Sequence, residues 1–130
     1  MNHYIEILKA SQLKATVQRL SILEIISHSG HITIDSIYQQ INQTHPTLSL
    51  ATIYKNILLM VEKDVLIEVP IAGSKSYYEL KKQDHIHIIC QECGAVEDKR
   101  LDDRVCSLSF DTFITSHVQI NIYGICSNCQ

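Results

Sequence analysis

The chain has 130 residues, of which 45% are hydrophobic and 19% charged, so a disordered chain is excluded and one domain or two small ones fit. The formal net charge is −3, and residues 1–80 carry six Lys/Arg against seven Asp/Glu. These values exclude nucleic-acid binding through overall positive charge, so any affinity for DNA must come from where the charges lie.

The N-terminal segment Met1–Glu6 has neither a basic region nor an apolar core, so we expect no signal peptide. The longest uninterrupted apolar run, Ile57–Val61, is far too short to cross a membrane. Five cysteines in such a chain favour metal binding over disulfide bonds. We therefore expect a cytoplasmic protein that does not bind membranes.

Apolar residues recur at helical spacing in the N-terminal half, where four helices are expected. The first covers residues 3–12, and each of the others follows a capping residue: Thr16 before a helix to about residue 28, Thr33 before one that ends ahead of Pro46, and Ser49 before a helix over residues 50–63. In the last helix, the predicted apolar stripe is Leu50, Ile53, Ile57 and Val61.

Two extended runs, residues 65–70 and 76–80, flank a glycine-containing turn and predict a β-hairpin. Helices followed by a hairpin make a winged helix, a variant of the helix-turn-helix. The fourth helix is then the candidate for a DNA major groove, with Thr52, Lys55 and Asn56 facing outward. The alternative is a small core that binds no DNA.

The polar segment Lys81–Asp84 marks the expected boundary between a domain of residues 1–80 and one of residues 84–130. The second domain is expected to contain strands over residues 85–90, 96–100 and 118–122, in an antiparallel sheet, with a helix over residues 102–115. So small a unit buries too little apolar surface to be stable alone. A zinc ion, which contributes about 10 kcal/mol in small metallo-domains, or a partner subunit is expected to stabilise it.

Two Cys-x-x-Cys motifs, Cys90/Cys93 and Cys126/Cys129, each direct two sulfurs toward one point. Four thiolates from two such turns predict a closed tetrahedral structural Zn²⁺ site. A redox disulfide pair is the alternative. The fifth cysteine, Cys106, is interpreted as a small buried hydrophobic residue, with a thiol sensor as the alternative.

His85 and His87 are two residues apart in an expected strand, so both imidazoles project from one face. The four-thiolate site is already full, which leaves both histidines for a second metal. A strand surface without metal, or extra ligands for the cysteine turns, are the alternatives.

Four motifs together resemble the ferric uptake regulator (Fur) family over about residues 10–129: Thr16–Arg19, Ser49–Asn56, His85–Gly94 and Tyr123–Cys129. The resemblance implies an α+β protein, with an N-terminal winged helix that binds an operator in double-stranded DNA and a C-terminal α/β domain that forms a homodimer. It also implies a metal-responsive transcription factor rather than an enzyme.

By motif position, the family's regulatory metal ligands fall on His31, Glu79, His85, His87 and Asp98. Three imidazoles and two carboxylates suit Fe²⁺ or Mn²⁺ better than all-sulfur ligation would. His31 and Glu79 belong to the first domain and His87 and Asp98 to the second, so binding would fix the angle between the domains and shift the population toward the DNA-binding conformation.

Asp98 resembles the peroxide-stress regulator (PerR) subgroup, because iron-uptake members usually carry Glu there. In that subgroup ferrous iron reduces peroxide, and the oxidant attacks an imidazole, here that of His31 or His85, which releases DNA. Glu79 departs from the peroxide-sensor pattern, where Asp is usual. An iron-uptake or zinc-uptake regulator is therefore the alternative, and a metallohydrolase using His85, His87 and Asp98 or a structural zinc-binding module are less favoured.

The resemblance also implies DNA contacts. Tyr54 and Thr52 match the family's base-facing residues, and Arg19, Lys55 and Asn56 are the candidate groove or phosphate contacts. One departure from the family pattern concerns the backbone: Asp64 replaces a common Gly after the fourth helix, which costs about 1 kcal/mol if that residue requires a positive φ.

Overall fold

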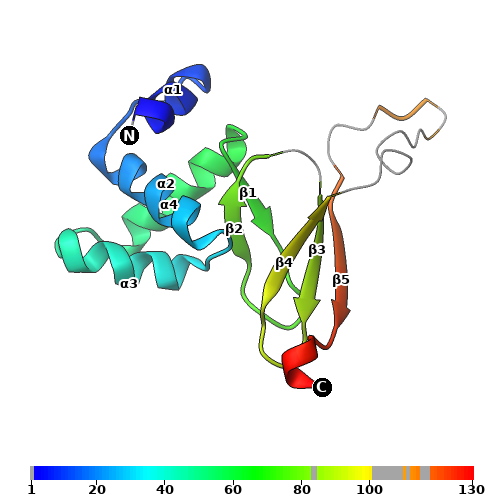
Figure 1. The fold of residues 1–130 in the computed structure, drawn as a ribbon. Coiled ribbons are helices and arrows are strands. Elements are labelled where there is room, and N and C mark those ends of the chain that lie inside the picture. The colour runs from blue at the N-terminus through cyan, green and yellow to red at the C-terminus, as the bar shows by residue number, and fades with distance from the viewer. Residues whose placement is uncertain (1, 83–84, 101–109, 111, 115–117) are drawn as a thin grey trace. The chain divides into compact units, whose positions relative to one another are not determined.

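The computed structural model describes residues 2–82, 85–100, 110, 112–114 and 118–130. The chain divides into two units, Met1–Lys81 and Lys82–Gln130. The first contains, in chain order, α1 (Asn2–Ala10), α2 (Val17–Ser29), α3 (Ile34–Thr44), α4 (Leu50–Glu62), β1 (Leu66–Val69) and β2 (Tyr77–Leu80), as Figure 1 shows. The roles expected for the two domains remain predictions.

The helices of the first unit begin where the capping residues predict. The side chains of Thr16, Thr33 and Ser49 each accept the backbone N–H of the third residue after them, which satisfies one of the otherwise unpaired donors of the first turn. The three predicted caps are confirmed. The helices then surround a core of aliphatic side chains, among them Leu23, Ile37 and Ile57.

The predicted apolar stripe of α4 is confirmed in part. Ile53 and Ile57 are fully buried, but Leu50 is 43% exposed, and Met60 is buried where the prediction had Val61. Leu50 is the first residue of α4, so it lies at the end of the helix and the core does not cover it. Met60, one turn after Ile57 on the same face, extends the buried row instead.

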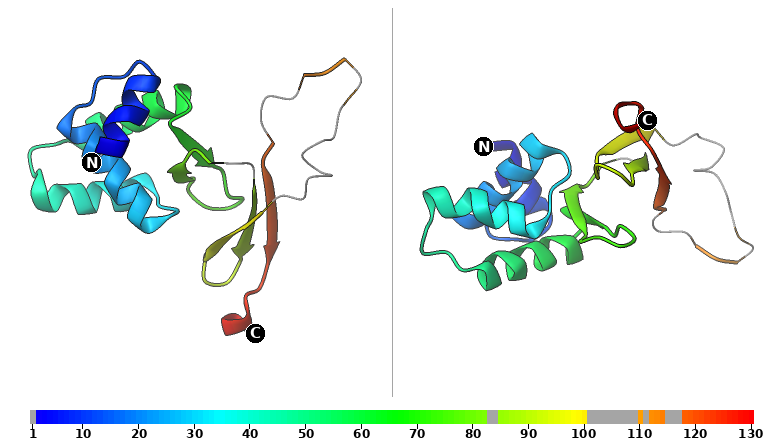
Figure 2. Two further views of the ribbon diagram at one scale, coloured as in Figure 1. Left: turned by 45° about the horizontal axis from the view of Figure 1, so that its top comes forward. Right: turned by 90° about the horizontal axis from the view of Figure 1, so that it is seen from below.

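The hairpin forms the wing of a winged helix, as predicted. β1 and β2 are antiparallel, with Ile67 opposite Glu79. Ile32, just ahead of α3, adds a bridge to Tyr78 through two backbone hydrogen bonds of 3.2 and 2.8 Å. The hairpin thus lies against the helices, with β2 beside α2 and β1 beside α4 (Figures 1 and 2).

The second unit is built on a three-stranded sheet of β3 (His85–Cys90), β4 (Val96–Arg100) and β5 (Ile120–Gly124), in the order β4-β3-β5. β4 is antiparallel to β3 as predicted, but β5 is parallel to β3, so the sheet is mixed and the prediction of an antiparallel sheet is wrong for this pair. Because β4 reverses the chain, its last residue Arg100 and the first residue of β5, Ile120, both lie beside the start of β3, and β5 then runs in the direction of β3.

The helix predicted over residues 102–115 lies mostly outside the described residues, as does Cys106. Of the residues that are described there, Phe110 and Phe113 form an isolated bridge rather than a helical turn. Among all helices of the described residues, none is long and apolar enough to cross a membrane.

Helix α4 ends in a left-handed turn at Asp64, where φ is 60°. The N–H of Val65 bonds to the carbonyl of Met60 at 2.8 Å and that of Asp64 to Val61 at 3.1 Å, the two bonds of a Schellman cap. Val65 and Met60 are both buried, which supplies the apolar contact of this motif. Asp64 therefore has the positive φ on which the cost of replacing glycine at this position depends.

We expect Asp64→Gly to raise the free energy of unfolding by about 0.5–1 kcal/mol, because glycine has no side-chain penalty at positive φ. The matched control is Lys63→Gly, one residue earlier at φ −90°. There glycine should lower the free energy by a similar amount, since it only adds backbone entropy to the unfolded chain. Urea unfolding followed by helical circular dichroism measures both, and equal losses in the two variants would contradict the account.

Candidate metal centres and nucleic-acid interface

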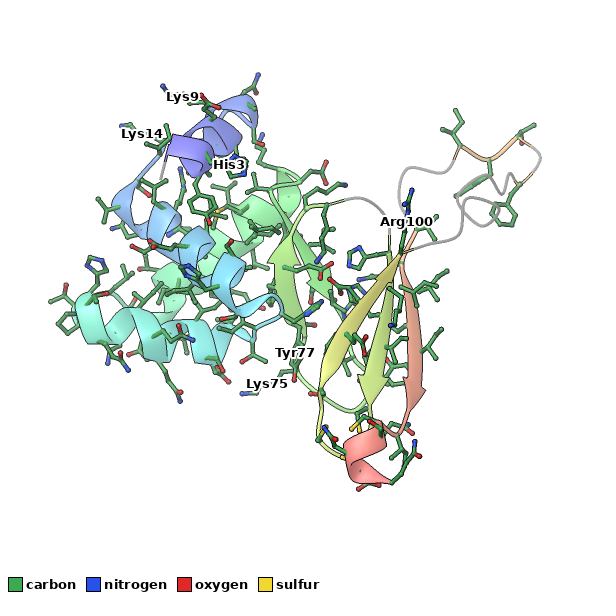
Figure 3. All side chains as sticks on the ribbon, viewed as in Figure 1. His3, Lys9, Lys14, Lys75, Tyr77 and Arg100 are labelled. Atoms are coloured by element: carbon green, nitrogen blue, oxygen red, sulfur yellow. The ribbon has the colours of Figure 1, made fainter. Side chains whose placement is uncertain are left out.

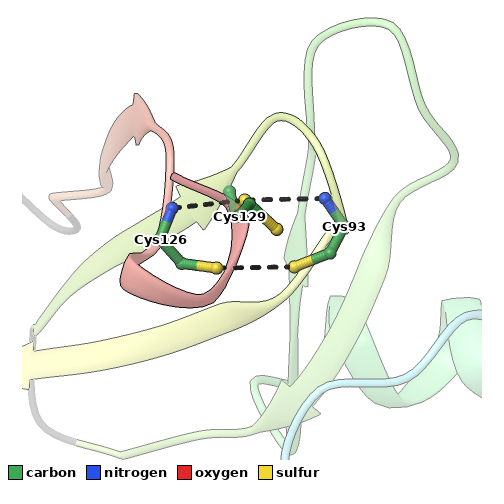
Figure 4. A group of neighbouring side chains, drawn as sticks. Cys93, Cys126 and Cys129 are labelled. Atoms are coloured by element: carbon green, nitrogen blue, oxygen red, sulfur yellow. Dashed lines mark hydrogen bonds between the residues drawn. The ribbon is translucent and has the colours of Figure 1, made fainter.

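The two Cys-x-x-Cys motifs lie at the same end of the second unit's sheet. Cys90 is the last residue of β3, its register partner in β5 is Gly124, and Cys126 lies two residues after the end of that strand. Because β3 and β5 are parallel, their C-terminal ends, which carry the two motifs, lie at the same end of the sheet. The four Sγ atoms lie within 4.8 Å of one another, and Figure 4 shows Cys93, Cys126 and Cys129 around the shared point.

The sulfur geometry fits a tetrahedral ion. The Sγ atoms of Cys93 and Cys126 are 3.8 Å apart. Two sulfurs bound to zinc at about 2.3 Å in a tetrahedron are separated by about 3.8 Å, whereas a disulfide bond is about 2.05 Å long. All four cysteines are free thiols in this structure. The structure therefore brings together the four predicted zinc ligands, and the arrangement is not that of a disulfide pair.

Backbone N–H groups stabilise the thiolate form of Cys90, the form that binds a cation. The N–H groups of Cys126 and Cys93 donate to Sγ of Cys90 at 3.4 and 3.5 Å. Together they lower the pKa of Cys90 to about 6. Hydrogen bonding to the sulfurs of Cys126 and Cys93 raises the pKa of Cys129 to about 12. Without a metal, the surroundings therefore favour the thiolate of Cys90 but disfavour deprotonation of Cys129. A bound divalent cation would favour the thiolate form of all four cysteines.

His85 and His87 lie on one face of β3, as predicted. Their Nε2 atoms are 2.9 Å apart and the rings meet edge to face, with centroids separated by 4.4 Å. Adjacent ligands of an octahedral ion at about 2.1 Å are separated by about 3.0 Å, so the two nitrogens fit a shared metal. The same distance suits a direct N–H···N hydrogen bond, the arrangement expected when no metal is bound.

Asp98 completes this group because it lies opposite His87 in the β3–β4 register. Its Oδ1 atom is 3.6 Å from Nε2 of His85 and 3.8 Å from Nε2 of His87. Its other oxygen, Oδ2, pairs with the ammonium of Lys82. Lys82 was not singled out from the sequence, where it reads only as part of a polar linker. Its pairing turns a single carboxylate oxygen toward the imidazoles.

In the first unit, His31 and Glu79 form a close pair. The bridge of Ile32 to Tyr78 sets these neighbours opposite each other, and Nε2 of His31 lies 2.7 Å from Oε2 of Glu79. Glu79 is fully buried, and the side chain of His31 is 11% exposed. Burial of a carboxylate is costly unless it has a positive or hydrogen-bonding partner, and the imidazole supplies one. The pair offers one nitrogen and one oxygen ligand.

The five residues predicted to contact DNA divide into two groups. Tyr54 and Lys55 are exposed on α4, with Tyr54 48% accessible. Arg19, Thr52 and Asn56 are partly buried and hydrogen-bonded. Beside Tyr54, a groove of about 360 Å³ lies between α4 and the hairpin, and its lining includes Leu50, Glu68 and Tyr78.

Comparison with known proteins identifies a family and a similar relative. The model of the ferric uptake regulator family matches residues 10–122. The chain is 33% identical to the peroxide-responsive repressor PerR of Staphylococcus saprophyticus over 128 residues, which cover 95% of this chain and 86% of that protein.

Two solved structures resemble this fold. The peroxide stress regulator of Campylobacter jejuni gives a TM-score of 0.71 at 30% identity and covers 96% of this chain and 98% of its own. The ferric uptake regulator of Vibrio cholerae gives 0.75 at 27% identity, with coverage of 94% and 98%. These similarities extend over both units of the chain.

We expect Cys126→Ser to abolish tight zinc binding, because serine is a poor zinc ligand and three thiolates leave the tetrahedron open. The zinc content should fall well below the wild-type value, and amides of β3 and β5 should exchange with deuterium much faster. Cys106→Ser is the matched control, since it removes a thiol but keeps both Cys-x-x-Cys motifs. Equal zinc loss in the two variants would contradict the four-thiolate site.

Proposed function

This chain belongs to the ferric uptake regulator family, and we propose that it is a metal-dependent transcriptional repressor that responds to peroxide. The observation that carries the proposal is the 33% identity to a peroxide-responsive repressor over 95% of the chain. The four thiolates support a structural zinc site in the second unit. In this proposal the second unit also forms the homodimer and the first unit binds an operator in double-stranded DNA.

The proposed regulatory site takes ligands from both units. His31 and Glu79 supply one nitrogen and one oxygen, and His85, His87 and Asp98 supply two nitrogens and one oxygen. Each set is incomplete by itself, but together they give the mixed nitrogen and oxygen ligation that suits Fe²⁺ or Mn²⁺. The two carboxylates also balance the charge of a divalent ion.

A ligand set shared between two units links metal binding to DNA binding. A short polar segment, residues 81–84, joins the two units in sequence, and in this proposal their relative orientation depends on the metal. Ligands on both units restrict that orientation when they bind one ion. If the restricted orientation is the one that fits the operator, metal binding shifts the population toward the DNA-binding form.

The peroxide response depends on residues beside the ion. In the net step one oxygen atom of hydrogen peroxide is added to an imidazole carbon, and the other leaves as water with the displaced C–H hydrogen. Bound ferrous iron would supply the electron that starts cleavage of the O–O bond. Asp98 offers one carboxylate oxygen while Lys82 holds the other, which limits the acid to one ligand atom and favours an open position. His31 and His85 are the proposed imidazoles that take up an oxygen atom. An oxidised ring is a poorer ligand, so the units are no longer held together.

Glu79 favours a second candidate, an iron-uptake regulator, because peroxide sensors usually carry Asp at this position. The resemblance to the Vibrio cholerae ferric uptake regulator fits the same alternative. Such a protein would bind ferrous iron and DNA without losing DNA when peroxide is added. The two functions therefore differ in a property that one experiment measures.

We expect the zinc-containing protein loaded with Fe(II) to gain one oxygen atom on the His31 or His85 peptide after low peroxide, and to release DNA. Peptide mass mapping and an electrophoretic mobility shift on the same sample measure both effects. The Mn(II)-loaded protein is the control and should stay unmodified and bound, because Mn(II) is much less reactive with peroxide. An Fe(II) form that stays unmodified and on DNA favours the iron-uptake regulator instead.

A further expectation concerns His87. We expect His87→Ala to lose the second metal ion but to keep its zinc, because only the imidazole cluster is changed. Equilibrium dialysis against Mn(II), with total metal analysis of the same sample, measures both ions. Loss of zinc together with Mn(II) would mean that the histidines belong to the thiolate site. Hydrolysis of a phosphate ester by the wild type that disappears in this variant would favour a metallohydrolase.

A further inference from the structure

Arg19 uses its guanidinium group inside the first unit. Its Nε donates to Oδ1 of Asn56 at 3.1 Å, and its Nη1 donates to the carbonyl of Lys14 at 2.8 Å. Asn56 lies on α4. Lys14, labelled in Figure 3, lies in the segment between α1 and α2. One side chain, rooted in the first turn of α2, therefore joins three separate segments.

The amide of Asn56 continues this connection into α4. Its Nδ2 donates to the carbonyl of Thr52, one turn earlier, at 3.0 Å. The orientation of the amide is fixed chemically, because a guanidinium only donates and a carbonyl only accepts. Thr52 is itself tied to the N-cap, since its N–H donates to Oγ of Ser49 at 3.1 Å. The chain of bonds runs from Lys14 through Arg19 and Asn56 to the start of α4.

We infer that Arg19 is a positioning residue for operator recognition, and that it acts through Asn56 to set the rotation of α4 about its own axis. This inference rests on the proposed DNA-binding function. It gives Arg19 and Asn56 a different role from the direct DNA contacts that the sequence predicts. The two bonds of Arg19 and the bond of Asn56 to Thr52 form the Arg19 clamp.

The rotation of α4 matters because Tyr54 and Lys55 project from it. Rotation of a helix by about 20° moves a side-chain tip, about 5–6 Å from the axis, by about 2 Å. Hydrogen bonds to base edges tolerate only a few tenths of an ångström. The buried residues Ile53 and Ile57 hold one side of α4 by apolar packing, which is not directional. The Arg19 clamp holds an adjacent side through directional bonds.

A phosphate contact and a positioning residue give different results on substitution. Lys can replace Arg at a simple phosphate contact, because both are cations, but its single ammonium cannot span Asn56 and the Lys14 carbonyl. Loss of a phosphate contact also reduces the slope of log affinity against log salt concentration by about one. Loss of positioning instead lowers the ratio of specific to non-specific affinity and leaves the salt dependence unchanged.

The experiment uses the Mn(II)-loaded full chain and a duplex that the wild type selects from a random DNA library. We expect Arg19→Lys, Arg19→Ala and Asn56→Ala each to weaken binding to that duplex by about tenfold or more, since tenfold is the lower end for one charge-assisted hydrogen bond. Binding to a scrambled duplex should change by less than twofold, about the scatter between independent sites. The double variant Arg19→Ala/Asn56→Ala should be no weaker than either single variant. Lys55→Gln is the comparator and should reduce the salt dependence.

Several outcomes overturn the inference. Full affinity of Arg19→Lys, or a reduced salt dependence of Arg19→Ala, would make Arg19 a phosphate contact. Equal losses on selected and scrambled duplexes would make the clamp a matter of stability alone. A wild type that selects no sequence contradicts the proposed function instead. In that case urea unfolding decides: additive losses for Arg19→Ala and Asn56→Ala would show that the two side chains are not coupled, and non-additive losses would support the clamp.

Discussion

The parallel pairing of β5 with β3 is the constraint on which the second unit depends. Both Cys-x-x-Cys motifs follow the carboxyl ends of these strands, and only a parallel pair brings such ends together. An antiparallel β5 would place its cysteines at the far end of a six-residue strand, about 20 Å away. Because so small a unit has little core, the thiolate site and the strand direction must stabilise each other.

Strand pairing also builds each half of the proposed regulatory site. The bridge between Ile32 and Tyr78 sets His31 opposite Glu79. The β3–β4 ladder sets Asp98 opposite His87. Backbone hydrogen bonds therefore hold each carboxylate beside an imidazole before any ion binds. Ligands held in place by strand pairing lose little freedom on binding, which favours affinity.

Much of this could be predicted from the sequence, and the exceptions have physical reasons. Helix starts followed from Thr16, Thr33 and Ser49, because a cap is a local interaction. The direction of β5 could not be predicted in this way, because the alternation of polar and apolar residues in a strand does not show whether its neighbour runs parallel or antiparallel. The cysteine spacing was the overlooked signal, since two motifs after two strands can meet only if the strands are parallel. Arg19 and Asn56 are 37 residues apart in sequence, and no local pattern reveals that they pair.

The hairpin between β3 and β4 carries Cys90 and Cys93 in its turn and Asp98 on its return strand. The turn is closed by the N–H of Cys93 on Sγ of Cys90, by the N–H of Gly94 on the Cys90 carbonyl and by the left-handed conformation of Gly94, so an extra residue there would displace the sulfurs. An extra residue in β4 instead turns Asp98 to the opposite face from His87. The spacing of residues 93 and 98 thus couples the two proposed metal sites, because a change of one residue displaces either the sulfurs or the carboxylate.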